Sequence, residues 1–193
     1  MLWLKEYLTQ LQGLVHDAEV TDAAGTALSL EPTLERLWQE VRASHERGNK
    51  LMFIGNGGSA GICSHTAIDY SKNGGVRSMA FNDGAALTCL ANDLGFERVF
   101  SEQMVFHARA GDILVAISSS GRSVDILNGV KAARERGCAV YTFSGFDPGN
   151  PLREMGDTNF YVASHEYGFV ELGHQTILHA ILDRGLGWTT EKK

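Results

Sequence analysis

After Lys50, the chain alternates short apolar runs with stretches whose apolar residues recur at helical spacing. The runs predict strands at Leu51–Ile54, Ser78–Phe81, Ile113–Ile117, Ala139–Phe143 and Asn159–Val162. The stretches between and after them predict helices at Ser59–Tyr70, Ala85–Leu90, Glu102–Ala108, Ser123–Arg136 and Gly168–Leu186. Because strands and helices alternate along the chain, the pattern indicates an α/β fold.

Two further helices are predicted ahead of the first strand. Leu2–Val15 is rich in leucine at helical spacing, and Pro32–Glu46 begins with a proline suited to a first helical turn. A polar, glycine-containing break at Thr21–Thr26 separates them. Such helices can cover a sheet face or pack against another subunit, and the leucine-rich first helix favours oligomerisation. We expect one domain over residues 1–193, with N-terminal helices in 1–47 and an αβα core in 48–188.

The predicted strands are apolar along their whole length rather than alternately apolar and polar. Strands of this kind are typical of a parallel sheet covered by helices on both faces. We therefore expect a three-layer αβα sandwich around a central, mainly parallel, five-stranded sheet. Ligands bind such sheets at the carboxyl ends of strands, which directs attention to Gly55–Ser59, Asn82–Asp83 and Ser118–Ser123.

The composition narrows the class of protein. The chain has 193 residues, 44% of them hydrophobic and 21% charged, as in an ordinary globular protein. Its net charge of −6, with no basic run, argues against a nucleic-acid or membrane partner. The three cysteines lack metal-motif spacing and are expected to be reduced. No membrane-spanning run or signal segment is recognisable, so we expect a cytoplasmic location.

The segment Gly55–Ser59, with the sequence GNGGS, joins a predicted strand to a predicted helix. Glycine lets the backbone approach a ligand closely, and the free amides of a first helical turn attract anions. A tight strand–helix connection is the equally open alternative. As a dinucleotide fingerprint the segment fits only the variant ending in Ala60, with Asp83 as the ribose-binding acid. This is a minor alternative, and we expect no nucleotide cofactor.

The segment Ser118–Ser123, with the sequence SSSGRS, places four serines around one glycine at the start of a predicted helix. Hydroxyl groups and the positive end of a helix dipole can surround a phosphate. A helix cap is the alternative, but a cap needs only one serine. We interpret the segment as a phosphate or sugar-phosphate site. It is not a P-loop, because no Gly-Lys-Ser/Thr occurs in the chain.

Two helices carry further groups able to perform chemistry. His65 and Asp69 are four residues apart, which suits two ligands of one metal or an acid–base pair, although a surface ion pair is the ordinary alternative. The last predicted helix adds polar residues among apolar ones: Glu171, His174, Gln175 and His179. Glu171 and His179 are roughly 80° apart around that helix, so we expect their side chains to converge.

These segments together resemble a known family. GNGGSA after a strand, ANDLGF at Ala91–Phe96, GDILVAISSSGRS at Gly111–Ser123 and a late H-x-x-x-x-H are similar to the sugar isomerase (SIS) domain, and within it to the phosphoheptose isomerases. The resemblance covers almost the whole chain. It implies a flavodoxin-like fold and isomerisation of sedoheptulose 7-phosphate to D-glycero-D-manno-heptose 7-phosphate. It also implies a homotetramer with active sites at subunit interfaces.

The resemblance further implies roles for individual residues. The serine loop would hold the phosphate, while the glycine loop and the aspartate of ANDLGF would line the sugar. The implied substrate-binding residues are Asn56, Gly57, Gly58, Ser59, Asp93, Ser118, Ser119, Ser120 and Ser123. The implied ligands of a divalent metal, with zinc as the expected ion, are His65, Asp69, Glu171 and His179. Asp69 and His179 would be the catalytic base and acid.

The chain departs from the family pattern at two of these positions. Asp69 replaces a glutamate and is one methylene shorter, and Glu171 replaces a glutamine and adds a negative charge. His/Asp/Glu/His is nevertheless a set suited to zinc or iron. The segment between Asp69 and Phe81 is also shorter than is usual in the family, and Lys72 lies close to where the family tends to carry arginine.

An aldose–ketose isomerisation moves one proton between C1 and C2 through a cis-enediol and needs a base, an acid and a stabiliser of charge. Asp69 and His179 would supply the first two, with His65 and Glu171 fixing a metal or polarising the oxygens. The alternatives are an isomerase of a different sugar phosphate, an amino-sugar phosphate isomerase or etherase, and a non-catalytic SIS-domain sensor or regulatory subunit. The four polar residues together favour catalysis.

Overall fold

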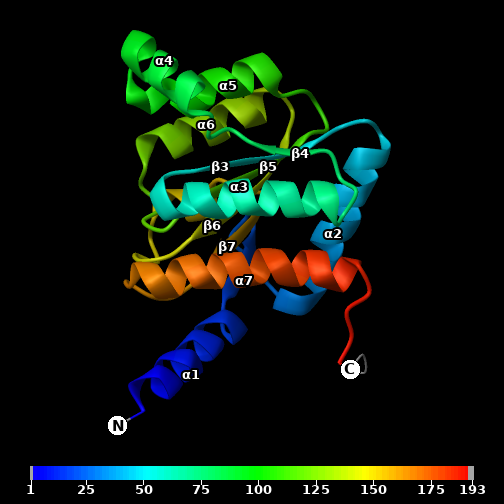
Figure 1. Cartoon of the computed structure of the whole chain (residues 1–193), viewed down its shortest axis with the longest axis vertical. Helices are drawn as coiled ribbons and strands as arrows, with labels where there is room; N and C mark the ends of the chain where they lie inside the picture. The colour runs from blue at the N-terminus through cyan, green and yellow to red at the C-terminus, as the bar shows by residue number, and fades with distance from the viewer. Residues whose placement is uncertain (1, 191–193) are drawn as a thin grey trace.

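The computed structural model describes residues 2–190, so residues 1 and 191–193 of the expected domain lie outside it. A seven-stranded sheet, in the order β2-β1-β7-β6-β5-β3-β4, is flanked by helices (Figure 1). The strands are β1 Glu19–Asp22, β2 Ala27–Leu28, β3 Leu51–Gly55, β4 Ser78–Ala80, β5 Ile113–Ser118, β6 Ala139–Ser144 and β7 Thr158–Tyr161. Strands β3 to β7 are parallel, whereas β1 pairs antiparallel with β2 and β7. The predicted αβα sandwich is confirmed.

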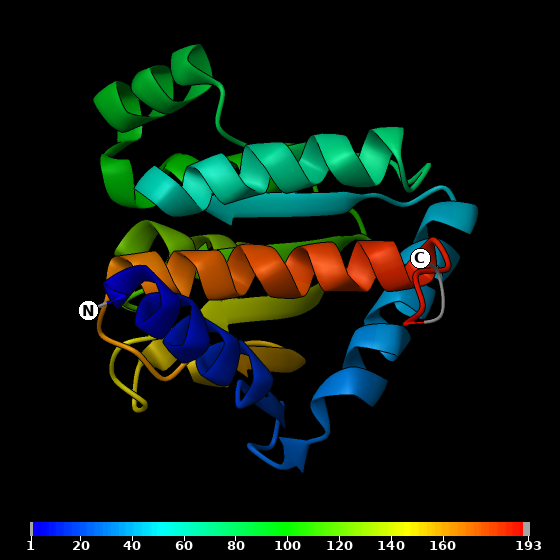
Figure 2. The same cartoon turned by 60° about the horizontal axis from the view of Figure 1, so that its bottom comes forward.

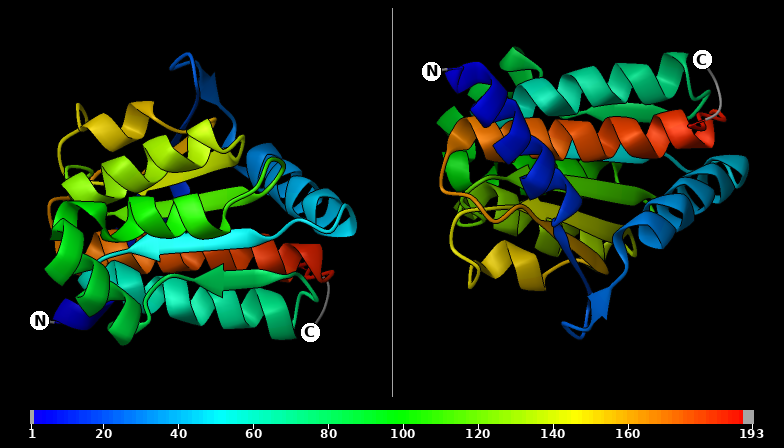
Figure 3. Two further views of the ribbon diagram at one scale, coloured as in Figure 1. Left: turned by 90° about the horizontal axis from the view of Figure 1, so that it is seen from above. Right: turned by 90° about the horizontal axis from the view of Figure 1, so that it is seen from below.

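The helices divide between the two faces of the sheet (Figure 3). They are α1 Trp3–His16, α2 Leu30–Glu46, α3 Gly57–Lys72, α4 Gly84–Leu94, α5 Val99–His107, α6 Val124–Glu135 and α7 Tyr167–Gly185, with short 3-10 helices η1 Phe96–Arg98 and η2 Pro151–Glu154. Apolar residues of α2, α3 and α7 pack on one face, and those of α5 and α6 pack on the other. Strand β3 shows the division, because Phe53 joins the first cluster and its neighbour Met52 the second.

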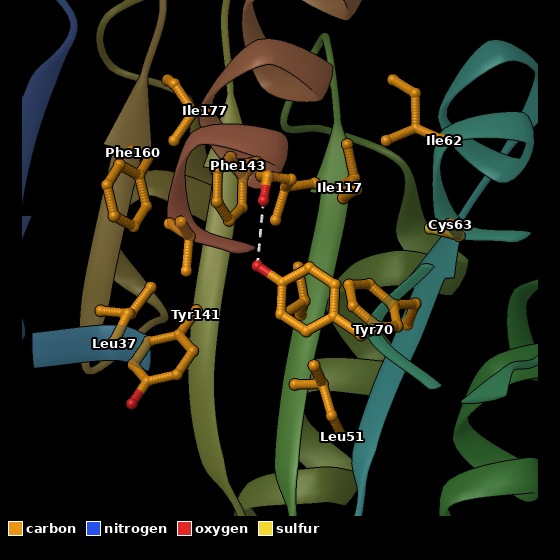
Figure 4. Close-up of a cluster of buried hydrophobic side chains, with 14 of the residues drawn as sticks. Leu37, Leu51, Ile62, Cys63, Tyr70, Ile117, Tyr141, Phe143, Phe160 and Ile177 are labelled. Atoms are coloured by element: carbon orange, nitrogen blue, oxygen red, sulfur yellow. Dashed lines mark hydrogen bonds between the residues drawn. The ribbon is translucent and has the colours of Figure 1, made fainter. Parts of the chain in front are cut away.

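The larger hydrophobic cluster lies beneath α2, α3 and α7 (Figure 4). Phe143 of β6 stacks on Phe160 of β7 with ring centroids 4.6 Å apart. The buried Tyr70 of α3 donates a hydrogen bond from its hydroxyl to the carbonyl oxygen of Leu178 in α7, at 3.0 Å. Burying an aromatic side chain of this size contributes about 1.5–3 kcal/mol. The cluster therefore holds α3 and α7 against the sheet and against each other.

The prediction of five strands was wrong, because β1 and β2 form a hairpin around the segment Thr21–Thr26, which we expected to be a break. Oδ1 of Asp22 accepts hydrogen bonds from the backbone of Ala24 and Thr26, at 2.9 Å each, and Gly25 adopts a φ of +77°. The hairpin is short and polar, so it lacks the apolar run that identified the other strands. Strand β1 is held by its pairing with β7, which extends the sheet into the first 47 residues.

Helices α1 and α4 have no fully buried residue. Helix α1 lies across α7 (Figure 2), and the ring of Tyr7 stacks on Phe169 at 4.4 Å. Helix α4 begins at its cap Asp83, whose Oδ1 accepts a hydrogen bond from the Ala86 amide at 2.9 Å. Leu8 of α1 stays 54% exposed. These two helices thus contribute little to the core of a single chain.

Within residues 2–190, no helix combines the length and the apolar character that crossing a bilayer requires. The three cysteines are free thiols, as expected, and Cys63 and Cys138 are buried. Burial raises the pKa of Cys138 to about 11, so this thiol stays protonated at neutral pH.

Candidate active site

The two predicted loops meet in one pocket at the carboxyl ends of β3 and β5. Because these strands are parallel neighbours, loops that are distant in sequence are brought side by side. The pocket has a volume of about 240 Å³. It is lined by Asn56, Gly57, Gly58, Ser59, Ile117, Ser118, Ser119, Ser120, Ser123, Tyr167 and Glu171. Every predicted substrate-binding residue except Asp93 lies in this set.

The glycine loop ends β3 and begins α3. Asn56 is the N-cap and has an extended backbone, with φ −108° and ψ 154°. A Cβ atom at Gly55 would lie 2.9 Å from Ser59, and one at Gly58 would lie 2.4 Å from the Glu171 carboxylate. Glycine is therefore required at Gly55, where the contact is with backbone, whereas a larger residue at Gly58 would displace the Glu171 side chain. Since the first residues of α3 line the pocket, the unpaired amides of that helix turn are available to an anion.

The serine loop follows β5 and precedes α6. Gly121 adopts a φ of +62°, and a Cβ atom there would lie 1.8 Å from Oδ1 of Asn150. Asn150 is wholly buried, and its Nδ2 donates to the carbonyl oxygen of Asp147 at 2.8 Å. The hydroxyl of Ser119 is buried and has no hydrogen-bond partner within residues 2–190. Buried hydroxyls normally form hydrogen bonds, so an oxygen atom of a ligand would supply the partner that the Ser119 hydroxyl lacks.

The pocket is not positively charged by side chains, because its lining contains no lysine or arginine. The nearby Arg122 turns to Asp147, with Nη2 2.6 Å from Oδ2. The Gly149 amide and Arg122 hold the pKa of Asp147 below its usual value, which keeps this pair ionised. An anion in the pocket would therefore be stabilised by the amino ends of α3 and α6 and by neutral donors.

Two histidines and an aspartate converge where α3 and α7 lie side by side. Oδ2 of Asp69 lies 3.2 Å from Nε2 of His65 and 3.8 Å from Nδ1 of His179. One ligand atom from each residue lies within 4.8 Å of the others. Three such donors, with a position left for water or substrate, are typical of catalytic zinc. These three residues, the His–Asp–His cluster, therefore fit a divalent metal.

Glu171 does not join the His–Asp–His cluster. It lies eight residues before His179 on α7, and a rise of 1.5 Å per residue separates them by about 12 Å along the axis. Our expectation that these side chains converge considered only the angle around the helix and ignored this rise. The Glu171 carboxylate instead lies against Gly58. In one chain, the pocket and the cluster are two groups about two helical turns apart.

The other polar residues of α7 do not face the pocket. His174 is wholly buried, and its Nε2 donates to the carbonyl oxygen of Ser144 at 3.0 Å. Burial lowers the pKa of His174 to about 4, so the ring is neutral at pH 7. The ring packs edge-on against Phe143, at 5.7 Å. His174 therefore belongs to the core beneath α7, and Gln175 has a buried Nε2 without a partner in the described part of the chain.

Asp93 lies outside the pocket, near the end of the exposed helix α4. Its Oδ1 accepts a hydrogen bond from Nδ2 of Asn92 at 2.8 Å, and its Oδ2 lies 3.7 Å from Sγ of Cys89. The ANDLGF segment thus forms the last turn of α4 and the turn at Gly95, where φ is +93°. In a single chain, the Asp93 side chain therefore bonds with residues of its own helix and does not line the pocket.

Two residues of the pocket, Ile117 of β5 and Tyr167, were not predicted as site residues. Tyr167 begins α7, one turn before Glu171, and lines the pocket although 63% of its surface is exposed. The spacing of four places both residues on one face of the helix, which is the signal that could have identified Tyr167. An isolated tyrosine at a helix start is a weak signal, because many such residues are simply solvated.

Comparison with known proteins defines the family. The SIS domain model matches residues 19–145. The phosphoheptose isomerase of Citrifermentans bemidjiense is 34% identical over 160 residues, which cover 80% of this chain and 83% of that protein. The phosphoheptose isomerase of Rhodospirillum rubrum is 35% identical over 147 residues, with coverages of 73% and 78%.

Solved structures have the same architecture. Phosphoheptose isomerase GmhA from Neisseria gonorrhoeae has a TM-score of 0.81 and 28% identity, covering 96% of this chain and 97% of its own. A phosphoheptose isomerase from Francisella tularensis has a TM-score of 0.79 at 23% identity, with coverages of 94% and 95%. The Vibrio vulnificus NanR protein complexed with ManNAc-6P shares the fold, with a TM-score of 0.67 at 15% identity over 95% of this chain and 60% of its own. The chain therefore belongs to the SIS domain family and, within it, to the phosphoheptose isomerases.

Proposed function

We propose that the protein is an aldose–ketose isomerase that interconverts sedoheptulose 7-phosphate and D-glycero-D-manno-heptose 7-phosphate. Its relatives are phosphoheptose isomerases. One observation carries the proposal: α3 and α7 carry the His–Asp–His cluster and also line a pocket whose hydroxyls come from the serine loop. The pocket has the donors that a phosphate needs, and the cluster has the groups that proton transfer needs. A sensor of sugar phosphates would need only the pocket.

In this proposal the serine loop binds the phosphate. The hydroxyls of Ser118, Ser119, Ser120 and Ser123 and the amino end of α6 are the donors, and Asn56 to Ser59 line the sugar. Phosphate binding takes place away from the reacting carbons. Its binding energy therefore serves to orient C1 and C2 at the catalytic groups.

Asp69 is the proposed base, which removes the proton from one of C1 and C2 and returns it to the other. His179 is the proposed acid, which moves a proton between the carbonyl and hydroxyl oxygens of the substrate. The two side chains are close enough to act on adjacent atoms, because Nδ1 of His179 lies 3.8 Å from Oδ2 of Asp69. His65, at 3.2 Å from the same oxygen, holds the carboxylate in position.

His65, Asp69 and His179 are also the proposed ligands of a divalent metal, with zinc as the proposed ion. A metal bound there supplies a Lewis acid that polarises substrate oxygens. A carboxylate has two oxygens, so Asp69 can serve as ligand and base. Glu171 of the same chain is too far along α7 to complete the set. The expected four-ligand site would require Glu171 of a second copy.

We further propose that the active site lies between subunits of a homotetramer. The pocket and the His–Asp–His cluster are separated on one chain, and apolar side chains are exposed on α3 beside the cluster and on α1. Ile68, next to Asp69, is 58% exposed, and Leu4 and Leu8 of α1 are 55% and 54% exposed. Exposed apolar residues in such numbers are typical of an interaction surface. A second copy on this surface would bring its own pocket, and the Asp93 of its α4, towards the cluster.

The proposal is tested by following sedoheptulose 7-phosphate by NMR, with and without a chelator. We expect interconversion that the chelator abolishes and zinc restores. Binding without product in either condition would favour the sensor. Turnover of another sugar phosphate, with none of this one, would favour a different isomerase.

A further inference from the structure

The α7 wall of the pocket consists of Tyr167 and Glu171, one helical turn apart. Neither residue is used by the proposed phosphate site, which lies across the pocket at the serine loop. Neither belongs to the His–Asp–His cluster. The two side chains therefore face the part of the substrate that lies between the phosphate and the reacting carbons.

The ring of Tyr167 is held in place by a strained neighbour. Phe146 packs its ring against Tyr167 edge to face, with centroids 4.9 Å apart and an interplanar angle of 77°. Within residues 2–190, Phe146 is the only residue other than glycine with a positive φ, at 57°. Its amide donates to the carbonyl oxygen of Ser164 at 2.9 Å, and its carbonyl oxygen accepts from the Tyr161 hydroxyl at 2.8 Å.

Such a backbone conformation is unfavourable for phenylalanine and persists only where the surroundings impose it, which is common at functional sites. Here it fixes an aromatic support beneath Tyr167. Tyr167 as a whole is 63% exposed, although the ring of Phe146 already covers one side of its ring. An oriented aromatic face at the rim of a polar pocket is a surface for the C–H groups of a ligand.

Glu171 adds the polar part of the same wall. Its carboxylate lies against Gly58, in the first turn of α3, and no lysine or arginine lines the pocket to neutralise it. A carboxylate repels phosphate but accepts hydrogen bonds from hydroxyl groups. The charge of Glu171 therefore directs the phosphate to the serine loop and leaves the α7 wall to hydroxylated carbons.

We propose that Tyr167 is a specificity-determining residue, whose ring packs on the hydroxylated carbon chain next to the phosphate. The inference rests on the proposed function and names the part of that site which recognises the sugar rather than the phosphate.

The test separates the sugar from the phosphate by using two probes, sedoheptulose 7-phosphate and inorganic phosphate. Tyr167→Ala should raise the KM for the sugar phosphate about 10-fold, while the inhibition constant of inorganic phosphate and kcat stay near wild type. Tyr167→Phe keeps the ring and should stay close to wild type. Phe106→Ala is the matched control, because Phe106 is 62% exposed but lies on α5 outside the pocket. An unchanged KM in Tyr167→Ala, or equal losses for both probes, would overturn the proposal.

If the wild type has no turnover, the proposed function fails. Calorimetric affinities for the two probes in Tyr167→Ala then still decide the inference.

Discussion

At the scale of single residues, Asp69 occupies the centre of the His–Asp–His cluster because both histidines approach the same carboxylate oxygen. Asp69→Asn keeps the shape of the side chain but removes its basicity. We expect kcat to fall by about 100-fold or more, while calorimetry shows that sugar-phosphate binding is retained. Asp69→Glu is the control, because it restores the carboxylate of the family pattern and should keep measurable turnover. A near wild-type rate in Asp69→Asn would exclude Asp69 as the base.

Ser119 has a buried hydroxyl without a partner in residues 2–190, so its removal should affect the ligand and not the fold. Ser119→Ala is expected to raise KM about 10-fold, the value of one hydrogen bond, without lowering Tm. Ser44→Ala is the opposite case, because the Ser44 hydroxyl donates to the carbonyl oxygen of Gly111 at 2.8 Å, away from the pocket. That variant should lower Tm and leave KM unchanged. If Ser119→Ala lowers Tm and leaves KM unchanged, the hydroxyl is structural.

His174 makes stability depend on pH. Its folded pKa of about 4 lies below the unfolded value near 6.5, so the unfolded chain binds the extra proton between these pH values. The stabilisation of the fold that comes from keeping His174 neutral is complete above about pH 6.5 and is lost as pH falls towards about 4. Between about pH 7 and about pH 5, the free energy of unfolding therefore falls by about 2 kcal/mol.

Urea unfolding measures this loss. His174→Gln should show a smaller drop over that range, while His16→Gln, at an exposed position, should behave as wild type. NMR titration of the wild-type ring is a second readout, and protonation of His174 above about pH 6 would contradict the argument.

At the scale of elements, four of the five strands that the sequence predicted are stabilised by burial, and only the edge strand β4 among them has an exposed residue. Strands β3 and β5 are apolar at nearly every position because both of their faces are covered, and this leaves a clear pattern. The β1–β2 hairpin has no such pattern, since Asp22 holds its turn and β7 supplies its partner strand. A short stretch of sequence does not show which distant strand it pairs with, so the sequence did not predict this hairpin.

The serine loop depends on one glycine. Gly121→Ala places a Cβ atom at a φ of +62° and onto Oδ1 of the buried Asn150, so the loop must move. We expect a loss of about 1–3 kcal/mol in the free energy of unfolding and a raised KM. Gly61→Ala is the matched control within α3, where nothing lies within 4 Å of the added carbon. It should stabilise the protein by about 0.5–1 kcal/mol with an unchanged KM. Equal effects of the two substitutions on urea unfolding would contradict this account.

At the scale of the whole molecule, the sequence predicted most residues that line the pocket and all three of the His–Asp–His cluster, but not how the two groups are arranged. The loops could be predicted because parallel strands end at one edge of the sheet. The separation of Glu171 from His179 could also have been predicted, since it follows from the rise of a helix. The position of Asp93 could not, because it depends on what packs against α4. These observations lead to the proposal that a second copy completes the site.

Subunit mixing tests the shared site. Asp69→Asn damages the cluster, and Ser120→Asp damages the pocket by placing a carboxylate where the phosphate would bind. If each site combines the cluster of one subunit with the pocket of another, random mixed oligomers contain intact sites. About a quarter of wild-type activity should then return. If both halves belong to one chain, every site stays damaged and mixing restores nothing. Asp69→Asn mixed with His179→Ala is the control, because both changes lie in the cluster and no site can be intact. Light scattering on the same samples measures the oligomeric state, and a monomer active as such would contradict the proposal directly.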